Sequence, residues 1–509
     1  EWQRRVPRLG IQGLGTWGSA EVWQMEGTTY SLDQKISLHR GQHLFKLGGR
    51  YVRYTGSRTN PENPSYVFNN KADMLANIPG NVNISFGSHG PHKSRMYEFG
   101  FFAQDDWRIS QKLVLNLGLR HDFYSNAVVK ETGAVPVAIV NLSPPSNLAT
   151  FDFGPSRPFD NPIENDAWAN LGPRFGFAFT PDGQGKTVVR GGYGILFAAQ
   201  VPALLRQSVA HPVVPFRIIW SKAEAQALGV RYPMYAEETL PIAERDVTAS
   251  GRRFIFSVLD PKLQNPYSQH FQLNVQRSLL QDLMLEVGYV GVHGVKYPLH
   301  RRFNQVDRAT GARPNPLLIP GGYFVDNSEN TSYHSLQTSL RKRFSSNLSF
   351  DAHYTFGKGL AYAGGDVGVY YGTDANDNIQ DFFNYRIDRG PSVGDVRHRF
   401  IADWIYQTPS LTGWGFAPLR QALGGWQVSG IISARTGGAV NITQGCQGSY
   451  HCRVDYVGGP PILKTPTEIT DGCRPGVHCD IQYLNANAFA RVPETASLRI
   501  AVRPGTAGK

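Results

Sequence analysis

The chain has 509 residues, of which 41% are hydrophobic, 12% aromatic and 18% charged, and 54 of them are glycine. This composition is rich in strand-forming and turn-forming residues and excludes a largely disordered chain. No apolar run reaches the roughly 18 residues of a membrane helix, so a membrane-spanning fold here requires a closed β-barrel. The net charge of +11 comes from scattered Lys and Arg residues, which indicates solvated rims and a basic lumen and argues against nucleic acid as a partner.

Six pairs of segments alternate apolar and polar residues with period two, which predicts two antiparallel strands in each pair. Short polar turns join the first five pairs, and a longer connection joins the sixth. In chain order the pairs occupy residues 35–54, 97–123, 173–197, 268–291, 335–358 and 397–435. The sequence therefore predicts an all-β chain with about twelve strands.

The second pair shows the alternation most clearly. On its second arm, four leucines alternate with polar or small residues: Leu113, Leu115, Leu117 and Leu119 against Asn116, Gly118 and Arg120. Each arm runs about 11 residues, which is the length that a tilted strand needs to cross a bilayer. We expect the leucines to face lipid and the polar or small residues to face a watery lumen. A soluble β-sandwich, with the leucines in a dry core, stays open on this pair alone.

The segments between the pairs are long. They cover residues near 55–96, 124–173, 198–266, 292–332 and 358–396. Loops of this length are uncommon in compact soluble domains, but outer-membrane barrels have short periplasmic turns and long extracellular loops. We therefore expect residues 1–435 to form a transmembrane antiparallel β-barrel portion. Residues 436–509 are expected to form a Cys-containing extracellular loop and the start of a C-terminal barrel region.

Six sequence blocks carry a further signal. They are RGQHLFKLGGRYVRY, YEFGFFAQDDWRISQKLVLNLGLRHDF, GPRFGFAFTPDGQGKTVVRGGYGILF, NPYSQHFQLNVQRSLLQDLMLEVGYVGVHG, SYHSLQTSLRKRFSSNLSFDAHYTFGK, and DVRHRFIADWIYQTP with LGGWQVSGIISARTGG. Together they resemble the barrel of TonB-dependent outer-membrane receptors, particularly the large Oar-like branch. The resemblance covers roughly residues 30–440, and six blocks in the family's order are more specific than any one of them.

The resemblance implies a 22-stranded barrel in the outer membrane of a Gram-negative-type bacterium. In that family an N-terminal plug domain fills the barrel, and a TonB box couples it to the TonB–ExbB–ExbD system of the inner membrane. We find no plug, TonB box or signal peptide here. We therefore expect an internal fragment, with two strand edges whose backbone groups are unpaired.

The function that the resemblance implies is active uptake of a small or oligomeric substrate across the outer membrane, with membrane lipid and the TonB system as partners. Two alternatives stay open: a structural or adhesive surface barrel, and a soluble β-rich carbohydrate-active protein. We expect no enzyme, and we assign no catalytic, cofactor or metal residue.

Two motifs are only weak indicators of a ligand site. GLGTWG at 13–18 fits a dinucleotide fingerprint, but no buried parallel strand precedes it, so a Gly-rich strand or loop is favoured. Four polar residues of one long loop could supply oxygen ligands to Ca²⁺, but they lack EF-hand spacing and are interpreted as solvated: Asp374, Asp377, Asn378 and Asp381. Neighbouring aromatic residues suit a ligand-gripping surface loop: Tyr370, Tyr371, Phe382, Phe383 and Tyr385.

The four cysteines form two similar pairs, Cys446 with Cys452 and Cys473 with Cys479. A metal site would favour closer CxxC-type spacing. We therefore expect two local disulfides, which an oxidising envelope permits. Zinc bound through both pairs, with His451 and His478 as further ligands, is the rival hypothesis.

Overall fold

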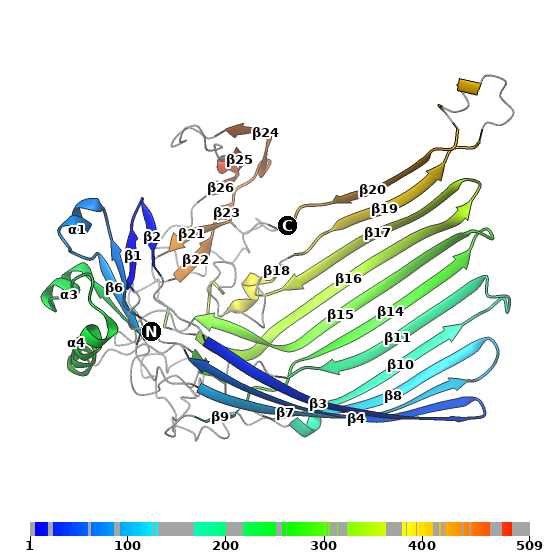
Figure 1. Ribbon diagram of the computed structural model, residues 1–509, viewed down its shortest axis with the longest axis horizontal. Coiled ribbons are helices and arrows are strands. Elements are labelled where there is room, and N and C mark those ends of the chain that lie inside the picture. The colour runs from blue at the N-terminus through cyan, green and yellow to red at the C-terminus, as the bar shows by residue number, and fades with distance from the viewer. Residues whose placement is uncertain are drawn as a thin grey trace.

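The computed structural model of the protein describes residues 6–18, 24–59, 63–85, 92–125, 128–130, 167–199, 217–250, 257–260, 262–302, 304–305, 313, 323–362, 379–382, 384–392, 394–410, 417–418, 422, 424–439, 442–446, 449–468 and 481–490. Long strands lie side by side in one large sheet, and a small sheet with helices stands beyond one end of these strands (Figure 1).

Twelve antiparallel strands form the main path of the large sheet, and each is paired with its neighbour along the chain. They are β3 (Gln24–Arg40), β4 (His43–Thr59), β7 (His92–Arg108), β8 (Leu113–Tyr124), β10 (Leu171–Phe179), β11 (Thr187–Phe197), β14 (Tyr267–Ser278), β15 (Leu283–Arg302), β16 (Tyr323–Ser345), β17 (Leu348–Ala361), β19 (His398–Gln407) and β20 (Gln427–Arg435). All six predicted strand pairs are confirmed. Three short strands pair with this path: β9 (Val128–Lys130), β13 (Ser257–Leu259) and β18 (Gly390–Pro391).

Tight turns close the hairpins at one end of the sheet. Gly41, with φ of +61°, lies in the turn between β3 and β4, and Ser346 and Asn347 (φ +47° and +65°) form the turn between β16 and β17. These left-handed conformations suit two-residue hairpin turns, because their twist matches that of the strands. The long connections between successive hairpins lie at the opposite end, which we call the mouth (Figure 1).

The two faces of the large sheet differ in chemistry. Large apolar side chains lie exposed on one face, which we call the outer face, and the register of neighbouring strands places them in rows across the sheet. They include Leu32 and Ile36 on β3, Leu47 on β4, Phe101 on β7, Leu117 and Leu119 on β8, Phe175 on β10, Tyr193 on β11, Leu273 on β14, Tyr289 on β15, Leu336 on β16, Phe356 on β17 and Phe400 on β19.

The sidedness predicted for β8 is confirmed. Leu117 and Leu119 are 41% and 45% exposed, and in the described part of the chain no second sheet covers them. Asn116 and Arg120 lie on the opposite, inner face, where their side chains contact other polar groups. A dry core between two sheets is therefore excluded, and with it the soluble β-sandwich.

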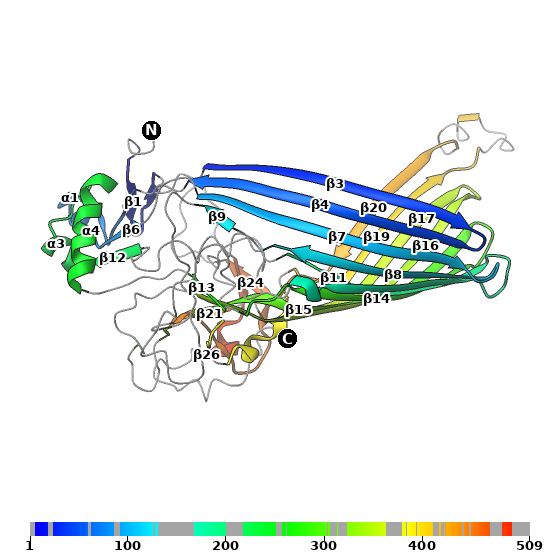
Figure 2. The same ribbon diagram turned by 90° about the horizontal axis from the view of Figure 1, so that it is seen from below.

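The large sheet is curved and open (Figure 2). Its end strands are β3 and β20, and among the described residues these two do not pair with each other. Two strand edges were expected, and both are present. No helix among the described residues is long and apolar enough to cross a membrane.

The small sheet at the mouth was not predicted from the sequence. Its strand order is β12-β6-β5-β1-β2. The strands are β1 (Arg8–Ile11), β2 (Gly15–Trp17), β5 (Ser65–Phe68), β6 (Asn81–Ser85) and β12 (Arg217–Ser221), and the helices beside them are α1 (Lys71–Leu75), α3 (Lys222–Ala227) and α4 (Ala236–Ser250). We call this unit the mouth sheet. It combines the segment before β3 with the connections β4–β7 and β11–β14 (Figure 1).

The mouth sheet has its own core. Tyr66, Phe68, Ile84 and Trp220 are all at most 2% exposed. Two polar atoms of this core form hydrogen bonds to α4 and to the residues just before it. The Tyr66 hydroxyl donates to the Met234 carbonyl at 2.7 Å, and Trp220 Nε1 donates to a carboxylate oxygen of α4 at 2.8 Å. Loops from distant parts of the chain are thus packed into one unit.

The described residues also contain short elements. These are three 3₁₀ turns, η2 (Ala167–Ala169), η3 (Tyr385–Asp388) and η4 (Ala486–Ala488), and three two-stranded sheets made of β21 (Thr443–Cys446) with β22 (Ser449–Arg453), β23 (Asp455–Tyr456) with β26 (Phe489–Ala490), and β24 (Ile462–Glu468) with β25 (Ile481–Leu484).

Candidate functional site

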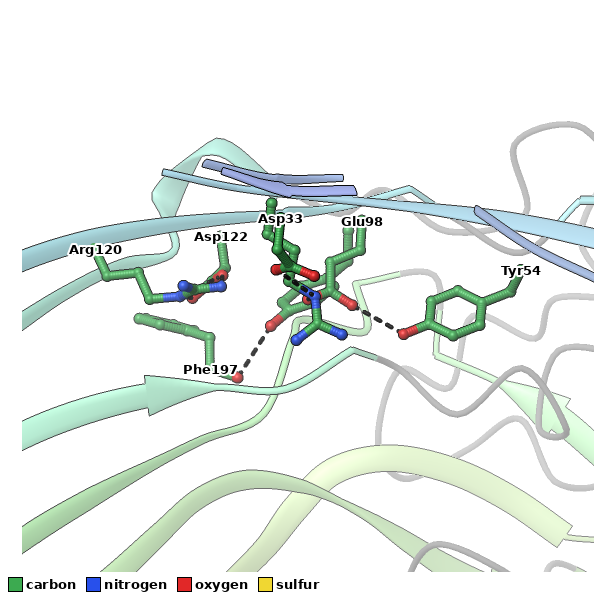
Figure 3. Close-up of polar contacts among 8 residues, drawn as sticks. Asp33, Tyr54, Glu98, Arg120, Asp122 and Phe197 are labelled. Carbon is green, nitrogen blue, oxygen red and sulfur yellow. Dashed lines mark hydrogen bonds and ion pairs between the residues drawn. The ribbon is translucent and has the colours of Figure 1, made fainter. Parts of the chain in front are cut away.

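A row of charged residues crosses the inner face of four neighbouring strands. The strand register aligns Asp33 on β3 with Arg50 on β4, then with Gly100 on β7 and Asp122 on β8. Because side chains alternate between the two faces of a strand, aligned residues of one row all point the same way. Here they point into the space that the curved sheet partly encloses (Figure 3). We call this row and the polar side chains that contact it the inner cluster.

Arg120 and Asp122 form the tightest contact of the inner cluster. Arg120 Nε donates to both carboxylate oxygens of Asp122, at 2.8 and 2.9 Å, and Nη2 lies 2.6 Å from Oδ1. The two residues are neighbours on one face of β8, since they are two positions apart. The Asp122 side chain is only 7% exposed, so this charge is held on the inner face by its guanidinium partner.

Gly100 makes room for this ion pair. A Cβ at Gly100 would lie 2.4 Å from Arg120 Nη2 and 3.0 Å from Asp122 Oδ1. No side chain can occupy that space without moving the guanidinium. The glycine in the row therefore leaves the space in which the Arg120 guanidinium, bonded to Asp122, lies.

Arg50 connects the other carboxylates of the inner cluster. Its Nε lies 3.7 Å from Asp33 Oδ1 and 3.9 Å from Glu98 Oε1, and the Tyr54 hydroxyl donates to Glu98 Oε2 at 3.1 Å (Figure 3). Three carboxylates thus face two guanidinium groups. Arg50 is 43% exposed, so this part of the cluster is accessible to a polar molecule inside the sheet.

A second polar group lies on the inner face nearer the turns. Asp106 accepts hydrogen bonds from Gln104 Nε2 at 2.7 Å and from Asn116 Nδ2 at 2.6 Å, and it is paired with Lys46. Each partner comes from a strand next to Asp106 or from its own strand. The inner face is therefore lined by polar contacts from the mouth towards the turns.

A groove of about 720 Å³ opens on the inner face across β8, β10, β11 and β14. Small residues form its floor, and two arginines, Arg174 and Arg190, border it. A Cβ at Gly176 or Gly192 on this floor would have its nearest neighbour at 3.5 Å, an ordinary contact. The groove is large enough for a hydrated polar ligand or an extended peptide segment.

At the mouth, Arg301 fastens the segment 379–391 onto the extended ends of β15 and β16. Its Nη1 donates to the Phe382 carbonyl at 2.7 Å, and its guanidinium is paired with Asp326. The guanidinium also lies over the rings of Phe382 and Tyr385, 4.8 and 5.1 Å from their centroids. Phe382 is only 5% exposed. These two aromatic side chains therefore hold the loop in place, whereas the sequence suggested a ligand-gripping surface.

Asp388 anchors the same segment from the other side. The backbone N–H and the Nε2 of Gln380 donate to its carboxylate at 2.9 and 2.8 Å, and Arg453 Nη1 lies 3.2 Å away. Burial raises the pKa of the Asp388 carboxyl above its usual range, while Arg453 and the bonds from Gln380 act in the opposite direction. The segment is thus bonded to strands on two sides.

The structure places the other motifs as follows. GLGTWG covers a turn and β2, and no helix begins there, so the favoured interpretation as a Gly-rich strand or loop is confirmed. Asp381 accepts a hydrogen bond from the backbone N–H of Asn384 at 3.1 Å, and residues 374, 377 and 378 lie outside the described residues, as do aromatic positions 370, 371 and 383. Groups of acidic, His or Cys side chains able to hold a metal ion are absent from the described residues.

The cysteine pairing stays a prediction. Cys446 ends β21 and Cys452 lies in β22, and the register sets Cys452 opposite Gln444 and Cys446 opposite Ser449. The side chains of Cys446 and Cys452, and all of Cys473 and Cys479, lie outside the described residues.

An antiparallel sheet of long strands, apolar outside and polar inside, with tight turns at one end and long connections at the other, defines the class of membrane-spanning β-sheet proteins. The chain belongs to the family described as "Outer membrane beta barrel domain", whose sequence profile matches residues 2–509. It is therefore a protein of the outer membrane, and the mouth is the extracellular end. No curated protein matches this chain.

Several solved structures are similar to this chain. They include the outer membrane transporter YddB from Escherichia coli (12% identity, TM-score 0.46, 87% of this chain and 47% of that chain) and the copper transporter OprC (9%, 0.42, 87% and 47%). The siderophore receptor PirA from Acinetobacter baumannii is a third (10%, 0.38, 84% and 51%). The chain spans about half the length of these proteins.

Proposed function

We propose that this chain forms part of the wall of a TonB-dependent outer-membrane transporter of the Oar-like branch. The observation that carries the proposal is the inner cluster, in which Arg50, Asp33 and Glu98 present charge to the space inside the sheet. The interior of outer-membrane barrels is polar in general, and in a transporter these accessible charges provide groups for a plug and a substrate to contact. The six sequence blocks described above support the same family.

In this role the chain does no chemistry. The long connections at the mouth capture the substrate, the inner face guides it, and the TonB–ExbB–ExbD system supplies the energy through a plug. Arg174 and Arg190, beside the groove, favour a substrate or plug segment that carries negative charge or carbonyl groups. The outer face remains in contact with lipid.

Uptake by the native bacterium tests the proposal. Cells with the intact gene, cells lacking the gene, and cells with the Arg50→Ala protein are given a defined mixture of peptides, oligosaccharides and metal chelates, and depletion of the medium is measured by mass spectrometry. We expect at least one compound class to be taken up by cells with the intact gene, and not by the deletion strain or the Arg50→Ala strain. A protonophore, which removes the energy of the inner membrane, is expected to abolish that uptake.

The matched control is Arg399→Gln, which removes an exposed cation from the inner face of β19, away from the inner cluster. Uptake with this variant is expected to equal that of the wild type. If the deletion strain depletes every compound as fast as the wild type does, the transport proposal is wrong.

An adhesive surface barrel is the second candidate, and one observation favours it. The mouth sheet exposes Trp17 and Leu75, which are 49% and 74% exposed, and exposed apolar side chains on a surface unit suit protein contacts. Attachment of the same strains to a solid surface separates the candidates, because a deletion that lowers attachment and leaves uptake unchanged favours adhesion.

A further inference from the structure

The outer face near the mouth carries a group of basic side chains on three neighbouring strands. His334 on β16 lies opposite Lys358 on β17, and Phe356 on β17 lies opposite His398 on β19. His334 lies two positions from Leu336 on β16, and His398 lies two positions from Phe400 on β19. The basic residues therefore share the lipid-facing side, on which Leu336 and Phe400 are exposed. The basic group therefore begins where the apolar band ends, at the level of the outer membrane–water boundary.

Two arginines from the neighbouring connection join this group. The Arg397 guanidinium lies over the Phe356 ring, 5.7 Å from its centroid. Arg389 donates to the Ser332 hydroxyl at 3.3 Å and to the Asn330 carbonyl at 3.4 Å. We call the group of His334, Lys358, Arg389, Arg397 and His398 the outer mouth patch.

The two histidines of the outer mouth patch are held in the same way. Nδ1 of His334 is 2.7 Å from the Tyr289 hydroxyl, and Nδ1 of His398 is 2.8 Å from the Tyr354 hydroxyl. When a tyrosine donates to Nδ1, the imidazole carries its proton on Nε2. Both rings then present an N–H donor beside the fixed cations.

Three cations of this patch have no directly paired carboxylate among the described residues; the nearby Asp395 carboxylate accepts from the backbone N–H of Gly359, the residue after Lys358. Within the described part of the chain, Lys358, Arg389 and Arg397 form no ion pair with Asp or Glu. The turn end of the sheet differs, because Lys342 there is paired with Asp282. Among the described residues, the mouth side of the outer face thus carries cations without a paired carboxylate, and such cations at a membrane surface attract anionic headgroups.

We propose that the outer mouth patch binds the phosphate groups of an outer-leaflet lipid. Lys358 and Arg397 provide charge, and the Nε2–H groups of His334 and His398 donate to phosphate oxygens. The acyl chains of the same lipid lie along the apolar band formed by Leu336, Phe356 and Phe400. A lipid thus pairs its phosphates with the cations and packs its acyl chains against the adjoining apolar side chains. An acidic protein provides only the first of these two contacts.

Binding of diphosphorylated lipid A to the full-length protein, purified from membranes in neutral detergent, tests this proposal. Native mass spectrometry counts bound lipids while the lipid concentration is varied. We compare the wild type with Lys358→Gln, Arg397→Gln and the double variant. Since each cation near an anionic surface changes affinity by about fivefold, the double variant is expected to bind about 25-fold more weakly.

The matched control is again Arg399→Gln, because this residue follows His398 on β19 but lies on the inner face. It removes the same charge at the same height from the opposite side of the sheet, and its affinity for lipid A is expected to equal that of the wild type. Retention of the compact, heat-modifiable band in gel electrophoresis verifies that each variant is folded. The result does not depend on uptake, so it stands apart from the transport proposal.

Three outcomes of the lipid titrations overturn the proposal: full lipid A affinity in the folded double variant, equal loss in Arg399→Gln, or equally tight binding of lipid A stripped of its phosphates. Inorganic phosphate at the same phosphate concentration is expected to compete weakly, since it lacks acyl chains. An acidic peptide that competes as strongly as lipid A favours a protein partner and also contradicts the proposal.

Discussion

Gly100 and Arg120 lie on neighbouring strands, and the guanidinium of Arg120 covers the glycine so closely that a Cβ would lie 2.4 Å from Nη2. Arg120 reaches this place because it is bonded to both carboxylate oxygens of Asp122. The missing side chain on β7 and the ion pair on β8 therefore form one structural unit.

Gly100→Ala is expected to displace the Arg120 guanidinium and to weaken its bonds to Asp122, whose side chain is 7% exposed. A buried group that loses a hydrogen-bond partner costs about 1–3 kcal/mol. We expect the free energy of unfolding, measured by urea titration in lipid vesicles, to fall by that amount. Gly118→Ala is the control, since a Cβ there has its nearest neighbour at 3.6 Å. An equal effect of the two substitutions would contradict the role of Gly100.

A charge at Leu273 is expected to block folding into lipid, because this outer-face side chain of β14 is 50% exposed. Arginine on the lipid face of a barrel costs about 2–4 kcal/mol near the middle of the bilayer. The control is Gln272→Arg, which places the same residue one position earlier, on the inner face. Folding yield in vesicles is expected to fall for Leu273→Arg alone; if Gln272→Arg lowers it as much, the assignment of the faces is wrong.

Asp282, in the turn between β14 and β15, has a pKa lowered to about 2 from its ordinary 3.8, because it accepts hydrogen bonds from Lys342 and Ser345. A carboxyl whose pKa is lower in the folded state stabilises the fold above the unfolded pKa, and this contribution is lost as pH falls. The Asp282 contribution is therefore expected to be present above about pH 4 and lost towards pH 2.

Carboxyl ¹³C resonances of labelled aspartate, with Asp282→Asn to assign the signal, measure this pKa. Lys342→Met is expected to return the Asp282 pKa towards 3.8. A pKa that stays near 2 without the lysine would show that Lys342 is not the main cause.

Arg301→Lys keeps the positive charge but loses the planar contacts with Phe382 and Tyr385. We expect the segment 379–391 to open more often, and the backbone amides of Gln380 and Phe382 to exchange hydrogen about tenfold faster, which corresponds to about 1.4 kcal/mol. Hydrogen-exchange mass spectrometry measures this rate.

The control is Arg386→Lys, an exposed arginine of the same segment whose side chain forms no hydrogen bond, ion pair or ring contact with the described residues. Its exchange is expected to match the wild type. Unchanged protection in Arg301→Lys would mean that the remaining anchors, Asp388 and the Gln305 side chain that bonds to Gln380 and Phe382, are sufficient to hold the segment.

The large sheet could be predicted because each strand pair is local. A period of two and a short turn define a hairpin within about 30 residues. The turn also fixes the register of the two strands, so the sequence shows which of their residues share a face. The same pattern predicts that Asp33 and Arg50 lie on one side of the sheet. It does not reveal that Gly100 and Asp122 continue the same row, because that alignment depends on the register between hairpins.

The mouth sheet could not be predicted for a different reason. β1 and β5 pair in parallel across more than fifty residues, and each has only four residues. Segments so short show no reliable alternation. Tyr66 and Trp220 are aromatic residues within long connections, and only the structure shows that they are buried in a shared core.

The central position of β5 and β6 in the mouth sheet limits which sequence changes this sheet can tolerate. Both strands come from one connection, residues 63–85, and they separate β1 on one side from β12 on the other. Deletion or replacement of that connection removes the neighbours of both flanking strands, while loss of β2 removes only an edge. The three contributing stretches are therefore expected to vary together among relatives, so that exchange of a whole mouth sheet preserves its core and exchange of one stretch does not.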